Sequence, residues 1–347
     1  MQNLNGKQIL IRADANSKVG SGHVMRCLAL AQEWHSRGGR ACLVSAELPH
    51  VILEKFTHSG IQVWNEKVPE DIHSDAEHVV DIAKRVNPDW IVVDGYGFGF
   101  DYQVTIREAG YHLLYIDDYG YMDQYVADIV LNQNMSANEE LYKNRCDYTQ
   151  LLLGPEYVLL RKECQPWASW KKNVSDSATK ILVTLGGGDL ENITLKVVRA
   201  LKLLPLTNIE VKIVVGHCNS NLAIIEKELG DAKFRNELLT SVNDMFLLMA
   251  WADLAISSGG STNWEMAFMG LPNLIIVSAE NQLGIAQGLH DKQVGINLGW
   301  YHHLEPLTIA NNLQRMICDQ EDRLKRSKNG KDLIDGNGAE RVCEKLL

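Results

Sequence analysis

The stretch KQILIRADANSKVGSGHVMRC, residues 7–27, joins a short apolar run to a polar loop with two glycines and then to a helix-like segment. A second stretch with the same order, TKILVTLGGGD, begins at residue 179. Short apolar runs that do not alternate with polar residues are typical of strands covered on both faces of a parallel sheet. The two similar beginnings therefore predict two Rossmann-like domains.

The rest of the chain continues the alternation of short apolar runs and longer mixed segments. Strand-like runs occur at residues 8–12, 41–45, 90–94, 113–117, 129–131, 180–184, 211–215, 254–257 and 273–277. Helix-like segments occur at residues 22–37, 75–85, 190–203, 219–229, 242–251 and 262–269. This alternation predicts an α/β protein built from two doubly wound parallel sheets.

The length of the chain also favours two domains. A chain of 347 residues, 46% of them hydrophobic, exceeds the size at which a single core usually stops growing. We expect an N-terminal domain over 1–165, a linker over 166–178, a second domain over 179–305, and C-terminal helices over 306–347 that pack on one or both domains. Two doubly wound domains facing each other across a cleft would hold a ligand at the carboxyl ends of their strands.

Composition excludes several classes of protein. Lys and Arg total 34 against 44 Asp and Glu, a net charge of −10, whereas a nucleic-acid binder needs a basic footprint. The seven cysteines are scattered without a CxxC spacing, which favours a reducing compartment. We find neither an N-terminal signal-peptide core nor a membrane-length apolar run. The sequence thus predicts a cytoplasmic protein with no nucleic-acid or membrane partner, and it implies no protein partner.

The glycine loop after the first strand carries the first chemical signal. Gly20 and Gly22 bracket Ser21 and would let a ligand approach the backbone closely just before a helix begins. His23 falls in the first helical turn, where helix N–H groups favour a neutral imidazole able to act as a base. The alternative is that His23 only caps or packs the helix. The loop has neither P-loop nor dinucleotide-fingerprint spacing, which disfavours ATP and NAD chemistry.

Two further strand ends carry acidic residues. Asp94 ends one strand and Tyr96 follows it, so this pair could orient His23 or hold a sugar hydroxyl, or could be only a turn Asp and a half-buried Tyr. Asp117 and Asp118 end the next strand. Adjacent strand residues point to opposite faces, so we interpret this pair as structural rather than as a metal site.

The second half of the sequence has two strand–glycine–helix junctions, and the later one contains more candidate ligand-binding residues. Gly260, Ser261 and Thr262 would supply free N–H groups and hydroxyls at a helix N-terminus, which is typical of a pyrophosphate cradle. Glu265, one turn further on, could accept the two hydroxyls of a ribose or could be a capping-box residue. Asn281 and Gln282 follow the next strand and offer amides to the same ligand.

Taken together, these segments resemble a known family. They are Ile11-Arg12, Gly20 to Cys27, Asp94-Gly-Tyr96, Leu131-Asn132-Gln133-Asn134, Gly154 to Arg161, Gly186 to Asp189, Gly259 to Glu265, and Asn281-Gln282. The chain resembles the UDP-2,4-diacetamido-2,4,6-trideoxy-β-L-altropyranose hydrolases of pseudaminic acid biosynthesis. The Ser-Gly-His-Val-Met-Arg-Cys segment is specific, whereas the glycine loops are shared with many glycosyltransferases of the two-domain GT-B fold, including MurG-like enzymes.

The resemblance implies a reaction and a set of residues. His23 would be the base, with Asp94 and Tyr96 beside the reacting centre as further candidate catalytic residues. The candidate substrate-binding residues are Arg12, Asp14, Gly20, Gly22, Arg26, Asn134, Gly187, Gly260, Ser261, Thr262, Glu265, Asn281 and Gln282. Trp264 and Gly95 depart from some family members, which puts fine substrate specificity in doubt.

The expected activity is metal-independent hydrolysis of a UDP-sugar at C1 with inversion, and no cofactor. The first alternative is a GT-B glycosyltransferase that passes the sugar from UDP to an acceptor. A non-catalytic nucleotide-sugar binder is the third class. Against a membrane-acceptor transferase, the first domain shows no apolar, basic run of the kind such enzymes display.

Overall fold

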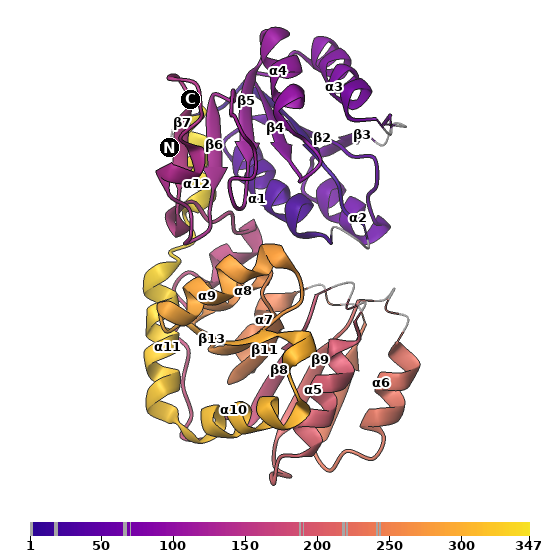
Figure 1. The fold of residues 1–347 in the computed structure, drawn as a ribbon, viewed down its shortest axis with the longest axis vertical. Coiled ribbons are helices and arrows are strands. Elements are labelled where there is room, and N and C mark those ends of the chain that lie inside the picture. Colours follow the sequence, from indigo (N-terminus) through magenta and orange to yellow (C-terminus); the bar gives the residue numbers. More distant parts are fainter. Residues whose placement is uncertain are drawn as a thin grey trace. The chain divides into compact units, whose positions relative to one another are not determined.

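A computed structural model describes residues 3–16, 20–64, 68–69, 71–186, 189, 191–216, 219, 221–240, 242 and 244–347. The chain divides into two compact units (Figure 1). The first comprises Met1–Lys162 together with Gly336–Leu347, and the second comprises Glu163–Asp335. Within the described ranges, no helix is both long enough and apolar enough to cross a membrane.

The first unit is built on a parallel sheet in the order β3-β2-β1-β4-β5-β6-β7. Its strands are β1 (Gln8–Ala13), β2 (Arg40–Val44), β3 (Gln62–Trp64), β4 (Trp90–Asp94), β5 (His112–Ile116), β6 (Ile129–Asn132) and β7 (Gln150–Leu153). The strand order reverses between β1 and β4, and Ala13 at the end of β1 is paired with Asp94 at the end of β4. Ligands of doubly wound sheets bind at such a reversal, beyond the carboxyl ends of the strands.

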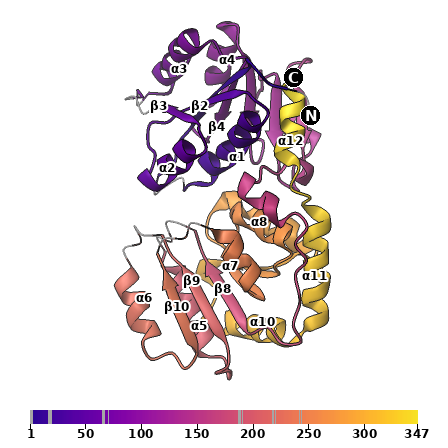
Figure 2. The same cartoon turned by 180° about the vertical axis from the view of Figure 1, so that it is seen from behind.

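Helices cover both faces of this sheet. They are α1 (Gly22–Ser36), α2 (His50–His58), α3 (Ile72–Val86), α4 (Phe100–Glu108) and α12 (Gly338–Lys345), with short 3₁₀ turns η1 (Glu139–Tyr142) and η2 (Pro155–Tyr157). Ile9 and Ile11 of β1 pack in one core cluster with α1, α2 and α12, whereas Leu10 packs in another with α3 and α4. The C-terminal helix α12 lies against α1 although most of the chain separates them (Figures 1 and 2).

The second unit repeats the design with a parallel sheet in the order β10-β9-β8-β11-β12-β13. Its strands are β8 (Lys180–Thr184), β9 (Glu210–Val214), β10 (Arg235–Leu239), β11 (Leu254–Ser258), β12 (Asn273–Val277) and β13 (Gly295–Trp300). Its helices are α5 (Ile193–Lys202), α6 (Leu222–Leu229), α7 (Met245–Trp251), α8 (Thr262–Met269), α9 (Leu283–Asp291), α10 (Pro306–Cys318) and α11 (Gln320–Leu333), with 3₁₀ turns η3 (Lys162–Trp167), η4 (Glu280–Gln282) and η5 (Tyr301–His303).

One face of this second sheet is covered by α5, α6 and α10, which share a core cluster with alternate strand residues. Helix α8 packs against α7 and α11. The strand order reverses between β8 and β11, so α8, which follows β11, begins beside the reversal. The predicted fold class, two doubly wound parallel sheets, is confirmed.

The predicted elements correspond to observed ones, but several observed elements were missed. The missed strands are β3, β7, β10 and β13, and the missed helices are α2, α4 and α9. Of the predicted C-terminal helices, α10 and α11 belong to the second unit and α12 to the first. Residues 166–178, expected to be a linker, lie in the second unit, where the Lys172 ammonium donates hydrogen bonds to Met249 O and Ala250 O near the end of α7.

Candidate functional site

A histidine–carboxylate pair lies at the strand-order reversal of the first unit. Asp94 is the last residue of β4, and His23 lies in the first turn of α1, which follows β1. Nδ1 of His23 is 2.6 Å from Oδ1 of Asp94, and both side chains are buried. A carboxylate only accepts hydrogen bonds, so Nδ1–H donates to it, and in the neutral imidazole Nε2 then carries the lone pair. Within the described residues, no hydrogen bond involves that Nε2.

Arg26 lies one turn after His23 on the same helix and joins the pair. Its Nε is 2.6 Å from Oδ2 of Asp94, and its Nη2 is 2.7 Å from Oδ1. The guanidinium thus grips the carboxylate with two parallel hydrogen bonds, a geometry that fixes orientation as well as charge. Cys27 donates a weaker hydrogen bond to Asp94 Oδ2 over 3.5 Å.

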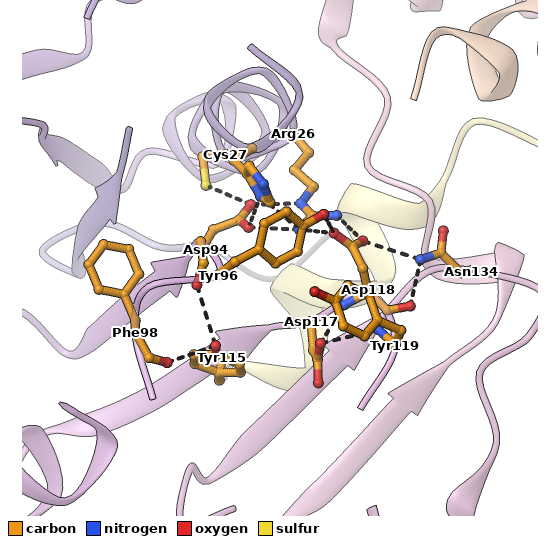
Figure 3. Close-up of polar contacts among 12 residues, drawn as sticks. Arg26, Cys27, Asp94, Tyr96, Phe98, Tyr115, Asp117, Asp118, Tyr119 and Asn134 are labelled. Carbon is orange, nitrogen blue, oxygen red and sulfur yellow. Dashed lines mark hydrogen bonds and ion pairs between the residues drawn. The ribbon is translucent and has the colours of Figure 1, made fainter. Parts of the chain in front are cut away.

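A second carboxylate, Asp118, shares the same guanidinium (Figure 3). Nη1 of Arg26 is 2.6 Å from Oδ1 of Asp118, and Nη2 is 3.2 Å from Oδ2. Tyr96 donates its hydroxyl to Oδ2 of Asp118 over 2.7 Å. Asn134 donates its amide to the Asp118 backbone O and to Oδ1, at 3.0 and 3.2 Å. Asp118 is therefore held from three segments of the chain.

The charges of the cluster shift the pKa of its members. Burial by itself would raise the pKa of Asp94, but the guanidinium of Arg26 and the imidazole of His23 outweigh it and hold that pKa well below its usual range. The same competition between burial and Arg26 lowers the pKa of Asp118. Both carboxylates are therefore ionised at neutral pH. With one guanidinium for two carboxylates, the cluster carries one net negative charge while the imidazole is neutral.

Tyrosines lie next to the imidazole. The ring of Tyr96 meets His23 edge to face, with 4.6 Å between ring centroids. Tyr119, which is largely exposed, and Tyr121 lie 5.6 and 6.4 Å from Tyr96, centroid to centroid. Burial raises the pKa of Tyr121 to about 12, although the hydrogen bond with Tyr115 acts in the opposite direction. Tyr121 is therefore a neutral hydrogen-bonding group at physiological pH.

The adjacent carboxylates Asp117 and Asp118 have different partners. Asp117 accepts the Tyr125 hydroxyl over 2.6 Å, and burial raises its pKa. Of the two aspartates, only Asp118 contacts Arg26. The prediction that both are structural therefore did not include the contact of Asp118 with the cluster around His23. No group of three or more His, Cys, Asp or Glu side chains placed to hold a metal ion occurs among the residues that the structure describes.

Two predicted substrate-binding arginines are committed to internal contacts. The Arg12 side chain is buried, pairs with Asp75 over 2.7 Å and with Asp14 over 2.6 Å, and packs on the Phe98 ring. Arg26 is engaged by Asp94 and Asp118, as described above. Because their guanidinium donors already have protein partners, we now interpret both arginines as residues that position carboxylates rather than as ligand contacts.

The remaining predicted residues of the first unit frame the loop before α1. Asp14 accepts hydrogen bonds at Oδ1 from Arg12, from Ser45 Oγ and from the Ala46 N–H. Gly20 adopts a positive φ of 79°, a conformation that glycine reaches at little cost, and Gly22 is the first residue of α1. This glycine turn lets α1 begin directly over the end of β1.

In the second unit, the N-terminus of α8 has free backbone donors. No hydrogen bond within the described residues uses the N–H groups of Gly260, Ser261 or Thr262, and no side chain caps the helix. The Asn263 side chain instead binds the loop before α8, because its amide donates hydrogen bonds to Ser258 O and Gly260 O, each over 2.7 Å. Uncapped N–H groups at a helix N-terminus are suited to bind an anion such as a phosphate.

Gln282 steadies the same loop. Its Oε1 accepts hydrogen bonds from Gly259 N over 3.1 Å and from Ser278 N over 3.0 Å. Glu265 lies in the first turn of α8 and is half-buried, and Asn281 precedes Gln282 in η4.

The glycine-rich loop after β8 differs. The Asp189 carboxylate accepts from Ile193 N and Thr194 N at 2.7 and 3.0 Å, so it already caps α5. An anion at that helix end would meet this carboxylate. The predicted ligand residue Gly187 lies outside the described residues.

Comparisons with known proteins agree with this architecture. Residues 180–342 match the glycosyltransferase family 28 C-terminal domain. The Bacillus subtilis spore coat polysaccharide biosynthesis protein SpsG is 25% identical over 96% of this chain and 95% of its own length. A Campylobacter jejuni UDP-2,4-diacetamido-2,4,6-trideoxy-β-L-altropyranose hydrolase is 26% identical over 63% of this chain and 73% of its own length. The chain is similar in sequence to both of these proteins.

Two further proteins resemble the chain in sequence or in fold. The uncharacterized protein MJ1062 of Methanocaldococcus jannaschii is 27% identical over 80% of this chain, and the match spans only 56% of that longer relative. Acinetobacter baumannii MurG aligns with a TM-score of 0.69 at 14% identity, over 98% of this chain and 99% of its own. This structural likeness shows the GT-B fold.

Proposed function

We propose that the chain hydrolyses a UDP-linked 2,4-diacetamido-2,4,6-trideoxyhexose to the free sugar and UDP, as a step of nonulosonic acid biosynthesis. The observation that carries the proposal is the His23–Asp94 pair, in which Nδ1 is bound and Nε2 has no hydrogen-bond partner among the residues that the structure describes. A base prepared in this way can activate water, which is the nucleophile that distinguishes hydrolysis from transfer. The named hydrolase among the relatives supplies the substrate class.

The base works by accepting a proton at Nε2. Water bound there loses a proton to the imidazole as its oxygen forms a bond to C1 of the sugar, while the C1–O bond to the diphosphate breaks and its electron pair leaves with UDP. Asp94 holds the imidazole in the tautomer that leaves Nε2 unprotonated, and it stabilises the imidazolium that forms. Attack from the face opposite the diphosphate inverts the anomeric centre.

The net charge around His23 suits this role. Asp94 and Asp118 share the single guanidinium of Arg26, so the cluster holds one uncompensated negative charge before the reaction. Proton transfer to His23 brings that sum to zero. The negative charge of the carboxylates thus stabilises the imidazolium that forms during the reaction.

We assign the diphosphate to the N-terminus of α8. The N–H groups of Gly260, Ser261 and Thr262 would stabilise the charge that develops on the leaving β-phosphate, and the hydroxyls of Ser261 and Thr262 add further donors. Glu265 would accept the ribose hydroxyls. Diphosphate is a good leaving group, so the scheme places no metal ion and no separate general acid in the reaction.

Glycosyl transfer is the second candidate, because the family 28 C-terminal domain and the MurG-like fold occur in glycosyltransferases. A transferase would use the same base on an acceptor hydroxyl instead of water. The deciding experiment supplies the purified chain with UDP-2,4-diacetamido-trideoxyhexoses and no acceptor, follows UDP release, and reads the product anomer by NMR. Hydrolysis predicts stoichiometric free sugar of inverted configuration, whereas release only on addition of an acceptor indicates a transferase.

A further inference from the structure

Asp118 contacts Arg26, although Arg26 does not need this contact in order to bind Asp94. Arg26 could satisfy Asp94 alone, because Nε and Nη2 already form a two-point contact with that carboxylate. Instead Nη1 turns to Asp118 Oδ1 over 2.6 Å, so the positive charge is divided between two carboxylates. The division leaves Asp94 less than fully neutralised where it contacts the imidazole.

We propose that Asp118 is a positioning residue that, by sharing Arg26 with Asp94, keeps a net negative charge beside His23 and thereby increases the proton affinity of its imidazole. The inference rests on the proposed role of His23 as the base. Asp118 does not act on the substrate itself. It acts through Arg26 and Asp94 on His23, and through a hydrogen bond on Tyr96.

The surroundings of Asp118 are built to hold it there. Asn134 donates to its backbone and side chain, and Asn134 is itself fixed because its N–H donates to Asn132 Oδ1 over 3.0 Å. Asn132 in turn donates to the Tyr142 hydroxyl over 2.7 Å. The Asn-Gln-Asn segment at the end of β6 thus supports the Asp118 carboxylate.

Tyr96 links Asp118 to the imidazole by a second route. The hydrogen bond from the Tyr96 hydroxyl to Asp118 Oδ2 fixes the ring that meets His23 edge to face. Loss of the Asp118 carboxylate would therefore alter both the charge near His23 and the side chain that packs on it.

Any effect on the protonation of His23 must be judged against all of its charged and titratable neighbours. In the described part of the chain these come from α1, from the end of β4 and the loop after it, and from the segment after β5: Arg26, Cys27, Asp94, Tyr96 and Asp118. Burial raises the pKa of the Cys27 thiol, which is therefore neutral at physiological pH. Asp118 is therefore the carboxylate that can be removed without breaking the hydrogen bond to Nδ1.

The test is an NMR titration of the His23 ring in the unliganded full-length protein. A charge a few ångströms away shifts a titration by about one to three pH units. We expect Asp118→Asn to move the His23 midpoint to lower pH by about one unit, because the variant loses a negative charge that stabilises the imidazolium. The control Asp117→Asn removes the neighbouring charge but keeps a side-chain oxygen for the Asp118 and Tyr119 N–H groups that Asp117 binds, and it should leave the midpoint where it is. An unchanged or higher midpoint in Asp118→Asn would overturn the proposal.

Tyr96→Phe gives a second test that does not depend on the folding of Asp118→Asn. It removes one donor to Asp118 but keeps the carboxylate and the ring, so the His23 midpoint should not fall. A fall like the one expected for Asp118→Asn would show that hydrogen bonding, not the charge, is responsible, and would contradict the proposal.

Kinetics separate this inference from the proposed function. In Asp118→Asn, kcat should fall about 10- to 100-fold with KM little changed, and the acid limb of the rate profile should move with the NMR midpoint. A rise in KM alone would indicate direct substrate binding and overturn the positioning role. If the unmodified protein releases no UDP, the proposed function fails, and the NMR titration still decides the role of Asp118.

Discussion

His23 and Asp94 are joined by a 2.6 Å contact between Nδ1 and Oδ1, although 71 positions separate them in the sequence. The contact exists because β1 and β4 are neighbours in the sheet, so the helix that follows β1 begins beside the end of β4. Since Asp94 is fully buried and held by Arg26, the imidazole has one orientation and one tautomer. The fold itself thus prepares Nε2 as a proton acceptor.

Asp94→Asn should lower kcat by about 10²- to 10⁴-fold while leaving UDP affinity nearly unchanged. The Asn amide can donate to Nδ1, which would place the proton on Nε2 and block its use as a base. The measurement is the rate of UDP release from a UDP-sugar, alongside calorimetry of UDP. Full activity in the folded variant would show that the tautomer of His23 does not matter.

The stability of the protein should fall in acid through the same cluster. The pKa values of Asp94 and Asp118 are lowered in the folded state, so their stabilising effect is complete above the ordinary aspartate pKa of about 3.9 and is lost as pH falls through the folded values. Thermal unfolding followed from pH 7 down to about pH 2 should show the loss below about pH 4.

Asp118→Asn provides the control for this acid effect. The variant should be less stable than the unmodified protein at neutral pH, because one partner of Arg26 loses its charge. Its unfolding temperature should also depend less on pH in the acid range. Parallel curves for the two proteins would mean that other carboxylates cause the acid effect.

The order of strands and helices could be predicted because buried parallel strands are continuous apolar runs. Trp90–Asp94 and Lys180–Thr184 were predicted with their observed bounds for this reason. Strands at the edge of a sheet lack this signal. Gln62–Trp64 has three residues, none of them buried, and Arg235–Leu239 carries charged and polar side chains, so neither stands out in the sequence.

Residues of the candidate site could be predicted where a single sequence motif contains both the end of a strand and the start of a helix. The loop before α1 identified His23, and the loop before α8 identified Gly260, Ser261 and Thr262. The role of Asp118 was missed because it depends on which residue of an adjacent pair faces Arg26. The position of Asp118 at the end of β5, next to β4, was the available signal.

Glu265→Ala should weaken UDP binding. A carboxylate that accepts ribose hydroxyls forms charge-assisted hydrogen bonds worth about 1.5–3 kcal/mol, so affinity should drop by roughly tenfold or more. Calorimetry with UDP measures the change, and Glu280→Ala, on η4, is a matched surface control that should bind UDP normally. Unaltered UDP affinity in Glu265→Ala would show that Glu265 does not bind the ribose.

Chelation of metal ions should leave turnover intact. The carboxylates nearest to His23 are already paired with Arg26, and the diphosphate charge is assigned to the N–H groups of α8. UDP release should therefore be equal with and without EDTA. Activity that disappears in EDTA and returns with Mg²⁺ or Mn²⁺ would favour a metal-assisted transferase.

The central claim is that His23 is the base that activates water, and UDP release by His23→Asn tests it most directly. Asn keeps a polar planar group in similar space but cannot take a proton. We expect kcat to fall by about 10²- to 10⁴-fold, with UDP affinity little changed because the nucleotide is assigned to the second unit. The unmodified enzyme should also lose activity toward acid pH as the imidazole becomes protonated. Undiminished UDP release by a correctly folded His23→Asn protein would contradict the claim and make the histidine structural.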